Sequence, residues 1–163
     1  FRWLHESFGT NWRMTEMQAA IGRIQLKRMP DWHSKRLSNA NNIWNAAKQC
    51  KGLRVPSILK HIEHAVYKCY VFVRLDKLDK DWCRDRIIRE INALGVPCYS
   101  GSCSEVYLEK AFDNTGFRPK ERLPNAKELG ESSLTFLVHP TLTEDEIKQT
   151  CDAITSTMEL ATK

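Results

Sequence analysis

A long amphipathic helical pattern opens the chain and constrains its fold more than any other feature. Apolar side chains recur at steps of three and four residues from Met14 to Ile24, which places them on one stripe of a helix. Thr15 and Gln18 have the spacing of a capping box, so the helix should begin near Thr15. The stripe resumes from Leu37 to Ala47, and Gly52 follows as a stop signal.

Pro30 interrupts this pattern and predicts a kink or a break, because proline removes a backbone donor and clashes with the preceding turn. Roughly 35 residues of nearly continuous helix is long for a compact domain. We therefore expect residues 1–51 to form an opening loop and a long connector or interface helix. Residues 52–163 should form a small carboxy-terminal α+β domain, since a chain of 163 residues is too short for two full-size domains.

The rest of the chain alternates between strand-like and helical segments. Residues 65–75 (AVYKCYVFVRL) are rich in β-branched and aromatic side chains and predict a strand central to a sheet. Further strands are expected at 96–99 and 134–138, and further helices at 82–95 and 143–158. This order predicts an α+β fold: a small antiparallel or mixed sheet of about three strands with helices on one face.

The net charge of +5 resides in the first third of the chain. Residues 1–50 contain eight basic and three acidic side chains, whereas the other residues contain equal numbers of basic and acidic side chains. Such a segment could face a phosphate-bearing ligand, an acidic protein surface or a nucleic acid, or simply be a solvated helix face. Nucleic acid is the least favoured partner, because the spacing of the tryptophans fits helix packing better than base stacking.

The cysteines and the hydropathy pattern argue against a disulfide-bonded, a metal-binding and a membrane-spanning protein. Several of the six cysteines lie in apolar stretches, so we expect buried, reduced thiols rather than disulfides. There is no CxxC pair and no zinc-ligand spacing, so no metal site is expected. The longest stretch without charge has 14 residues and is too short to span a bilayer. We expect a cytoplasmic protein without a membrane partner. The cysteines are Cys50, Cys69, Cys83, Cys98, Cys103 and Cys151.

Motifs of self-contained catalysis are absent from the sequence. GxSxG, HExxH, GxxxxGK[ST] and GxGxxG do not occur, and the five histidines are scattered. No residue of this chain is therefore a candidate for a catalytic role by itself.

One stretch carries a specific signal. Gly9-Thr-Asn-Trp-Arg-Met14 leads into TEMQAAIGRIQL at residues 15–26. This stretch resembles the DegT/DnrJ/EryC1/StrS family of pyridoxal-phosphate-dependent sugar aminotransferases, in which a G-x-N-x-R-M loop precedes a helix that reads E-x-QAAIG-x-x-QL. The resemblance continues at residues 64–72, at 95–112 and in FLVHPTLTEDEI near the end, so it covers essentially the whole chain as the carboxy-terminal part of such an enzyme.

The resemblance implies a fold, a cofactor and partners. It implies the small domain of a fold-type I aminotransferase that works as a homodimer. The complete enzyme would use pyridoxal phosphate to move an amino group from a donor such as glutamate to a keto sugar nucleotide. The family's Schiff-base lysine lies in the large domain, and none of the lysines here has its sequence context. We therefore expect this chain alone to be inactive and to lack the cofactor.

Two residues before the helix are the candidate cofactor contacts. In the family, the asparagine at the position of Asn11 reaches the cofactor phosphate across a dimer interface, which implies the same role here, with Arg13 beside it. An amide supplies hydrogen-bond donors to a phosphate without the desolvation cost of a second ion. From the residues alone, Asn11 could equally be a turn residue after Gly9.

Four residues between 99 and 107 are the candidate substrate contacts. The resemblance places Tyr99, Ser100, Ser102 and Tyr107 on a loop that lines the sugar-nucleotide pocket. Small hydroxyl side chains suit hydrogen bonding to sugar hydroxyls. An ordinary strand-to-helix turn with Ser104 as its cap explains the same residues. The loop also departs from the commoner family pattern, in which a histidine or tyrosine precedes proline and another histidine.

Two functions are consistent with these observations. The first is the carboxy-terminal portion of an aminotransferase for keto sugar nucleotides, serving surface polysaccharide or antibiotic biosynthesis. The alternative is a non-catalytic, truncated interaction module that self-associates through its exposed helix, because long apolar stripes seek partners.

Overall fold

The computed structural model describes residues 12–101 and 103–162 and confirms the α+β class. The helices are α1 (Glu16–Gln49), α2 (Arg84–Ala93), α3 (Pro124–Ser132) and α4 (Glu144–Ala161). The strands are β1 (Leu53–Arg54), β2 (Cys69–Val73), β3 (Cys98–Tyr99) and β4 (Ser133–Phe136). Short 3₁₀ turns are η1 (Leu75–Lys77), η2 (Val106–Leu108) and η3 (Lys110–Phe112).

The sheet is antiparallel throughout, with strand order β1-β2-β4-β3. It has four strands among the described residues rather than about three. The additional strand, β1, has two residues and is too short to produce an alternating pattern. The expectation that β2 lies centrally is confirmed, because it pairs with β1 on one side and with β4 on the other.

One face of the sheet forms the floor of the hydrophobic core. Directly paired residues point to the same face, so Cys69 and Phe136 share it, as do Val71 and Leu134. All four are fully buried. Helices α1, α2 and α4 cover this face, as the core residues from these helices show: Ala40, Ile43, Ala47, Ile87, Ile91, Ile154 and Met158.

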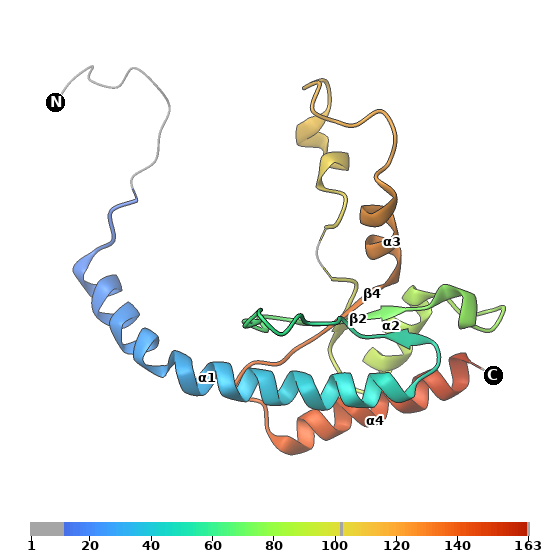
Figure 1. Ribbon diagram of the computed structural model, residues 1–163, viewed down its shortest axis with the longest axis horizontal. Coiled ribbons are helices and arrows are strands. Elements are labelled where there is room, and N and C mark those ends of the chain that lie inside the picture. Colours follow the sequence, from blue (N-terminus) through green and yellow to red (C-terminus); the bar gives the residue numbers. More distant parts are fainter. Residues whose placement is uncertain (1–11, 102, 163) are drawn as a thin grey trace.

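Helix α1 begins where the capping box predicts and continues past Pro30. The hydroxyl of Thr15 accepts from the backbone N–H of Gln18, and the side chain of Gln18 accepts from the backbone N–H of Thr15. Of the kink or break expected at Pro30, the break does not occur, since one helix runs from Glu16 to Gln49. The axis of α1 instead bends in its amino-terminal half (Figure 1), which is how a helix accommodates an internal proline.

The two halves of α1 have different surroundings. In the second half, Ala40, Ile43, Trp44 and Ala47 are buried, and the helix packs against α4. The first half extends beyond the sheet and the other helices (Figure 1). Its apolar stripe is exposed there: Met14, Met17, Ile21 and Ile24 are 53–78% exposed. A domain boundary at residue 51 stays a prediction, and the second half of α1 lies in the core together with residues 52–162.

Between β3 and β4 the chain leaves the sheet, rises away from it and returns (Figure 1). We call residues 103–132 the arm. The arm contains η2 and η3 on its outward leg and α3 on its return leg. Its two ends adjoin neighbouring strands, so the arm is anchored at the edge of the sheet.

Two expectations about the class of protein can be compared with the structure. All six cysteines are free, but the expected burial holds only for Cys69 and Cys98, since Cys83 and Cys103 are exposed and the other two are half-buried. Among the described residues, no helix combines the length and the apolar character that crossing a bilayer requires.

Phe136 provides a test of the core. It is 0% exposed and lies on a central strand, so Phe136→Ala should lower the free energy of unfolding by about 3–5 kcal/mol through lost burial and a cavity. Its neighbour Leu137 is 36% exposed, and Leu137→Ala should cost roughly 1 kcal/mol or less. Urea unfolding of both variants checks the difference, and equal losses would contradict the core described here.

Candidate functional site

The structure places the predicted site residues in two separate regions. Asn11 and Ser102 lie outside the described residues. Arg13 is exposed and lies just ahead of α1. The amino-terminal end of α1 points away from the sheet and lies far from the arm (Figure 1). Tyr99 and Ser100 lie together at the foot of the arm, and Tyr107 lies on its outward leg. Within this chain, the candidate cofactor contact Arg13 and the candidate substrate contacts are therefore apart.

The side chain of Arg84 organises the foot of the arm. Arg84 is at the start of α2, and its Nη1 atom donates to the carbonyls of Ser100, Gly130 and Ser133 at 3.4, 3.1 and 3.2 Å. Its Nε atom donates to Asp85 at 2.6 Å. The hydroxyl of Ser133 also donates to the carbonyl of Ser100 at 2.6 Å. One guanidinium thus joins the segment that enters the arm to the segment that leaves it.

Gly101 allows the turn at the foot of the arm to lie close to the sheet. Its φ of +90° is a left-handed conformation that residues with a Cβ rarely adopt. A Cβ here would lie 2.9 Å from the Tyr70 ring, 3.0 Å from the hydroxyl of Ser133 and 3.2 Å from that of Thr135. The turn therefore rests directly on the face of the sheet opposite the core. This position holds the backbone of Ser100 beside Tyr99.

A shallow hollow of about 510 Å³ adjoins this turn. The ring of Tyr99 is 53% exposed in it, and Asp85 and Arg89 of α2 contribute charges of opposite sign. A phenol, a carboxylate and a guanidinium can together bind hydroxyls and a phosphate. The hollow is lined by Asp85, Ile88, Arg89, Cys98, Tyr99, Ser100 and Gly101.

Tyr107 is in a different situation from Tyr99. It is only 9% exposed, and its hydroxyl donates to Glu105 Oε1 at 2.7 Å and accepts from the backbone N–H of Leu123 at 2.9 Å. Arg122 binds the same carboxylate through two nitrogens, with Nε 2.8 Å from Oε1. The hydrogen bonds from Arg122 and Tyr107 lower the pKa of Glu105 to about 2. Glu105 is therefore ionised at neutral pH.

The cofactor contacts that the family resemblance implies can be tested only in part. Arg13 carries a guanidinium, which fits a phosphate monoester by charge and by its fork of donors. It is solvent-exposed, so a ligand can reach it. Among the described residues, Arg13 is the one implied phosphate contact, and the donor chemistry fits the cofactor's phosphate.

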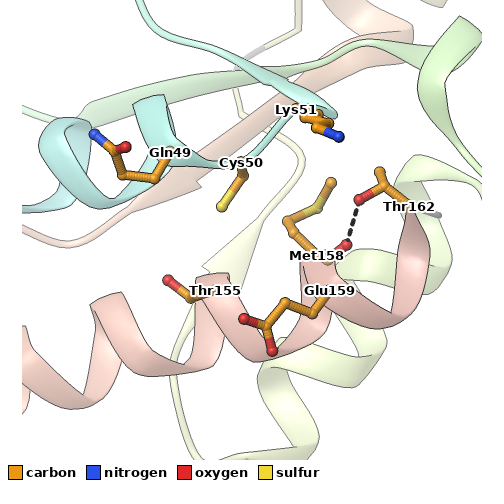
Figure 2. Close-up of a pocket in the computed structure, with 7 residues that line it drawn as sticks. All are labelled: Gln49, Cys50, Lys51, Thr155, Met158, Glu159 and Thr162. Atoms are coloured by element: carbon orange, nitrogen blue, oxygen red, sulfur yellow. Dashed lines mark hydrogen bonds between the residues drawn. The ribbon is translucent and has the colours of Figure 1, made fainter.

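A second hollow carries no comparable chemistry. Figure 2 shows a cavity of about 350 Å³ between the end of α1 and the last turns of α4. Burial and the nearby Glu159 carboxylate raise the pKa of the Cys50 thiol there, so the thiol stays protonated and a poor nucleophile. The hydroxyl of Thr162 is bonded to the carbonyl of Met158 at 2.7 Å. This cavity is a packing feature at the helix ends.

The thiols near the arm are equally unsuited to covalent catalysis. Burial raises the pKa of Cys98 to about 12. The hydrogen bond from the Cys103 thiol to Glu109 raises the pKa of Cys103 as well. Neither thiol forms a thiolate readily at neutral pH.

Sequence reasoning missed Arg84, Glu105 and Arg122 as site residues. The carbonyls that Arg84 binds lie 16 to 49 positions away in the sequence, and Arg122 lies 17 positions from Glu105. No local spacing rule relates residues so far apart, and charged residues at these positions look like ordinary surface residues in the sequence.

Arg84 gives a prediction about the foot of the arm. Its side chain is 16% exposed, so Arg84→Gln leaves carbonyl groups without their donor and should lower the free energy of unfolding by about 1–3 kcal/mol. Arg89→Gln on the exposed side of α2 removes the same charge and should be nearly neutral. Denaturant unfolding of the two variants measures the difference. An unchanged free energy of unfolding in Arg84→Gln would contradict the role of Arg84 in joining the two ends of the arm.

Glu105 gives a prediction about pH. Because its pKa is lowered from 4.5 to about 2 in the folded chain, its contribution to stability is complete above pH 4.5 and is lost as pH falls towards 2. In Arg122→Gln the carboxyl should titrate closer to 4.5. The ¹³C chemical shift of the Glu105 carboxyl measures both values, and identical titration in the two proteins would contradict the ion pair.

Comparison with known proteins relates these features to a family. A sequence profile of the DegT/DnrJ/EryC1/StrS aminotransferase family matches residues 1–155. A solved aminotransferase from Psychrobacter cryohalolentis is 65% identical, with a TM-score of 0.88 over 98% of this chain and 42% of that chain. The erythromycin biosynthesis sensory transduction protein EryC1 of Saccharopolyspora erythraea is 27% identical over 145 residues, which is 88% of this chain and 37% of the relative.

A second curated relative has a sugar substrate in its name. The dTDP-3-amino-3,4,6-trideoxy-alpha-D-glucose transaminase of Streptomyces venezuelae is 25% identical over 153 residues, 94% of this chain and 38% of that protein. The chain thus spans about two fifths of the length of the proteins it matches. These matches confirm the resemblance seen in the sequence and the relation of the fold to aminotransferases. The chain belongs to the DegT/DnrJ/EryC1/StrS aminotransferase family.

Proposed function

We propose that this chain is the carboxy-terminal part of a pyridoxal-phosphate-dependent aminotransferase that acts on keto sugar nucleotides. The observation that supports this most strongly is the 65% identity to the Psychrobacter cryohalolentis aminotransferase over almost the whole chain. The relatives from erythromycin biosynthesis and dTDP-sugar transamination support a sugar nucleotide as substrate. The product would be an amino sugar for surface polysaccharide or antibiotic biosynthesis.

In this proposal, the two regions of the chain serve different parts of the reaction. Pyridoxal phosphate supplies an aldehyde that accepts an amino group from a donor such as glutamate and passes it on. Asn11 and Arg13 bind its phosphate. Tyr99 and Ser100, together with Ser102, bind the sugar nucleotide at the foot of the arm, where the hollow beside α2 is open.

The separation of Arg13 from the arm supports a homodimer. The amino-terminal end of α1 lies far from the arm, which stands above the second half of the helix (Figure 1). A phosphate contact and a substrate loop at these two places meet in one active site when different subunits contribute them. The exposed stripe from Met14 to Ile24 supplies an apolar surface for such contacts. The alternative function, a self-associating interaction module, is supported by this same stripe. The hollow beside α2 does not support it.

A fusion protein tests the proposal. The part of the Psychrobacter cryohalolentis aminotransferase that precedes its matching segment is joined to this chain. We expect the fusion to show the visible absorbance of bound pyridoxal phosphate and glutamate-dependent transamination of keto sugar nucleotides. The chain alone should show neither, because the Schiff-base lysine lies in the large domain of this family.

The parent Psychrobacter enzyme is the positive control for the fusion. A fusion that folds and dimerises but transfers no amino group to any keto sugar nucleotide would contradict the proposed function. Transamination by the chain alone would contradict its dependence on a large domain. Sedimentation of the chain alone as a strong self-associating species, combined with an inactive fusion, would favour the interaction module instead.

A further inference from the structure

The carboxylate of Glu105 is the centre of a hydrogen-bond network on the arm. It accepts two hydrogen bonds from the guanidinium of Arg122 and one from the hydroxyl of Tyr107. Its side chain is only 12% exposed. Charge-assisted, forked hydrogen bonds to a nearly buried carboxylate fix both side chains in one geometry. The network joins the outward leg of the arm to its return leg.

The hydroxyl of Tyr107 has no remaining hydrogen to offer a ligand. It donates its one hydrogen to Glu105 and accepts from the backbone N–H of Leu123. A phenol has one donor hydrogen, so a substrate hydroxyl could recruit Tyr107 as a donor only by breaking its bond to Glu105. The geometry of Tyr107 is that of an internal strut, although its place in the sequence suggests a substrate contact.

Two further arginines hold the same loop. Arg118 on the return leg donates to the carbonyls of Tyr107, Leu108 and Glu109 at 2.9–3.2 Å. Arg84 holds the carbonyl of Ser100 at the foot of the arm. The loop is thus attached to the return leg along its length. Arg118 also pairs with Asp113, and Arg122 also pairs with Glu131. Glu105 differs from these two acids because its carboxylate binds Tyr107 as well as Arg122.

We propose that Glu105 is a positioning residue, which orders residues 103–109 through Tyr107 and Arg122 and so sets the affinity of the substrate hollow at the foot of the arm. The substrate half of this inference rests on the proposed function. Tyr107 acts through Glu105 and makes no direct hydrogen bond to the sugar nucleotide. A loop ordered before the ligand arrives loses less entropy on binding, so the network affects substrate affinity more than turnover.

A double-mutant cycle in the fusion protein tests the substrate half of the inference. Glu105→Gln and Tyr107→Phe should each raise KM for the keto sugar nucleotide roughly tenfold, with kcat changed by about twofold or less. Because both remove the same strut, the double variant should be no worse than the worse single variant. Arg122→Lys keeps the charge but loses the fork, and should give a smaller rise in KM. Glu121→Gln, at the exposed position next to Arg122 on the return leg, is the control and should leave KM unchanged.

Amide hydrogen exchange on the 163-residue chain tests the positioning role without any activity. Glu105→Gln should accelerate exchange in residues 103–109, and Glu121→Gln should not. Exchange that stays as slow in Glu105→Gln as in the parent chain overturns the positioning role, whatever the fusion does.

The outcomes separate this inference from the proposed function. KM effects of Glu105→Gln and Tyr107→Phe that multiply to roughly a hundredfold overturn the inference, because Tyr107 would then contact the substrate directly. An active fusion in which Glu105→Gln has the parent KM also overturns it, while the proposed function stands. An inactive fusion overturns the proposed function and the substrate half together, and the exchange result still decides whether Glu105 orders the loop.

Discussion

The structure depends on the burial of one apolar face of a sheet whose strands are very short. None of the four described strands exceeds five residues, and two have only two residues, so backbone pairing alone gives little stability. Phe136, Leu134, Cys69 and Val71 are covered by α1, α2 and α4. The helices therefore determine where the strands lie, and the second half of α1 is as much a part of the core as the sheet.

Covering one face in this way leaves the opposite face available for the loop that enters the arm. Gly101 rests there against Tyr70 and the hydroxyls of Ser133 and Thr135. The arm has little apolar core of its own, since the bulky side chains of Leu108, Phe117 and Leu123 are at least 44% exposed. Guanidinium groups that bind backbone carbonyls and carboxylates hold the arm together instead, and they give it a fixed shape where burial cannot.

Local patterns in the sequence predicted the parts of this fold that depend on local rules. The capping box at Thr15, the central strand and the buried stripe after Leu37 are all encoded within a few residues. The sequence did not predict β1, because two residues are too few to show the alternation of apolar and polar side chains that is typical of a strand. Pro30 predicted a kink or a break, and the helix continues and bends, because a helix can accommodate a proline by bending. The contacts of Arg84 and Arg122 that hold the arm could not be predicted, since they join residues that are far apart in sequence.

The arginine contacts also explain why similar side chains in one loop differ in the chemistry they can do. Tyr99 and Tyr107 are eight positions apart and have the same phenol, but Tyr99 is 53% exposed beside a hollow and Tyr107 is 9% exposed with its hydroxyl saturated. Sequence can suggest that both face a substrate. Only the position of Glu105, set by Arg122 from the return leg, separates the exposed phenol from the structural one. In this loop, the hydrogen bonds of the charged side chains determine which residues remain available to bind a substrate.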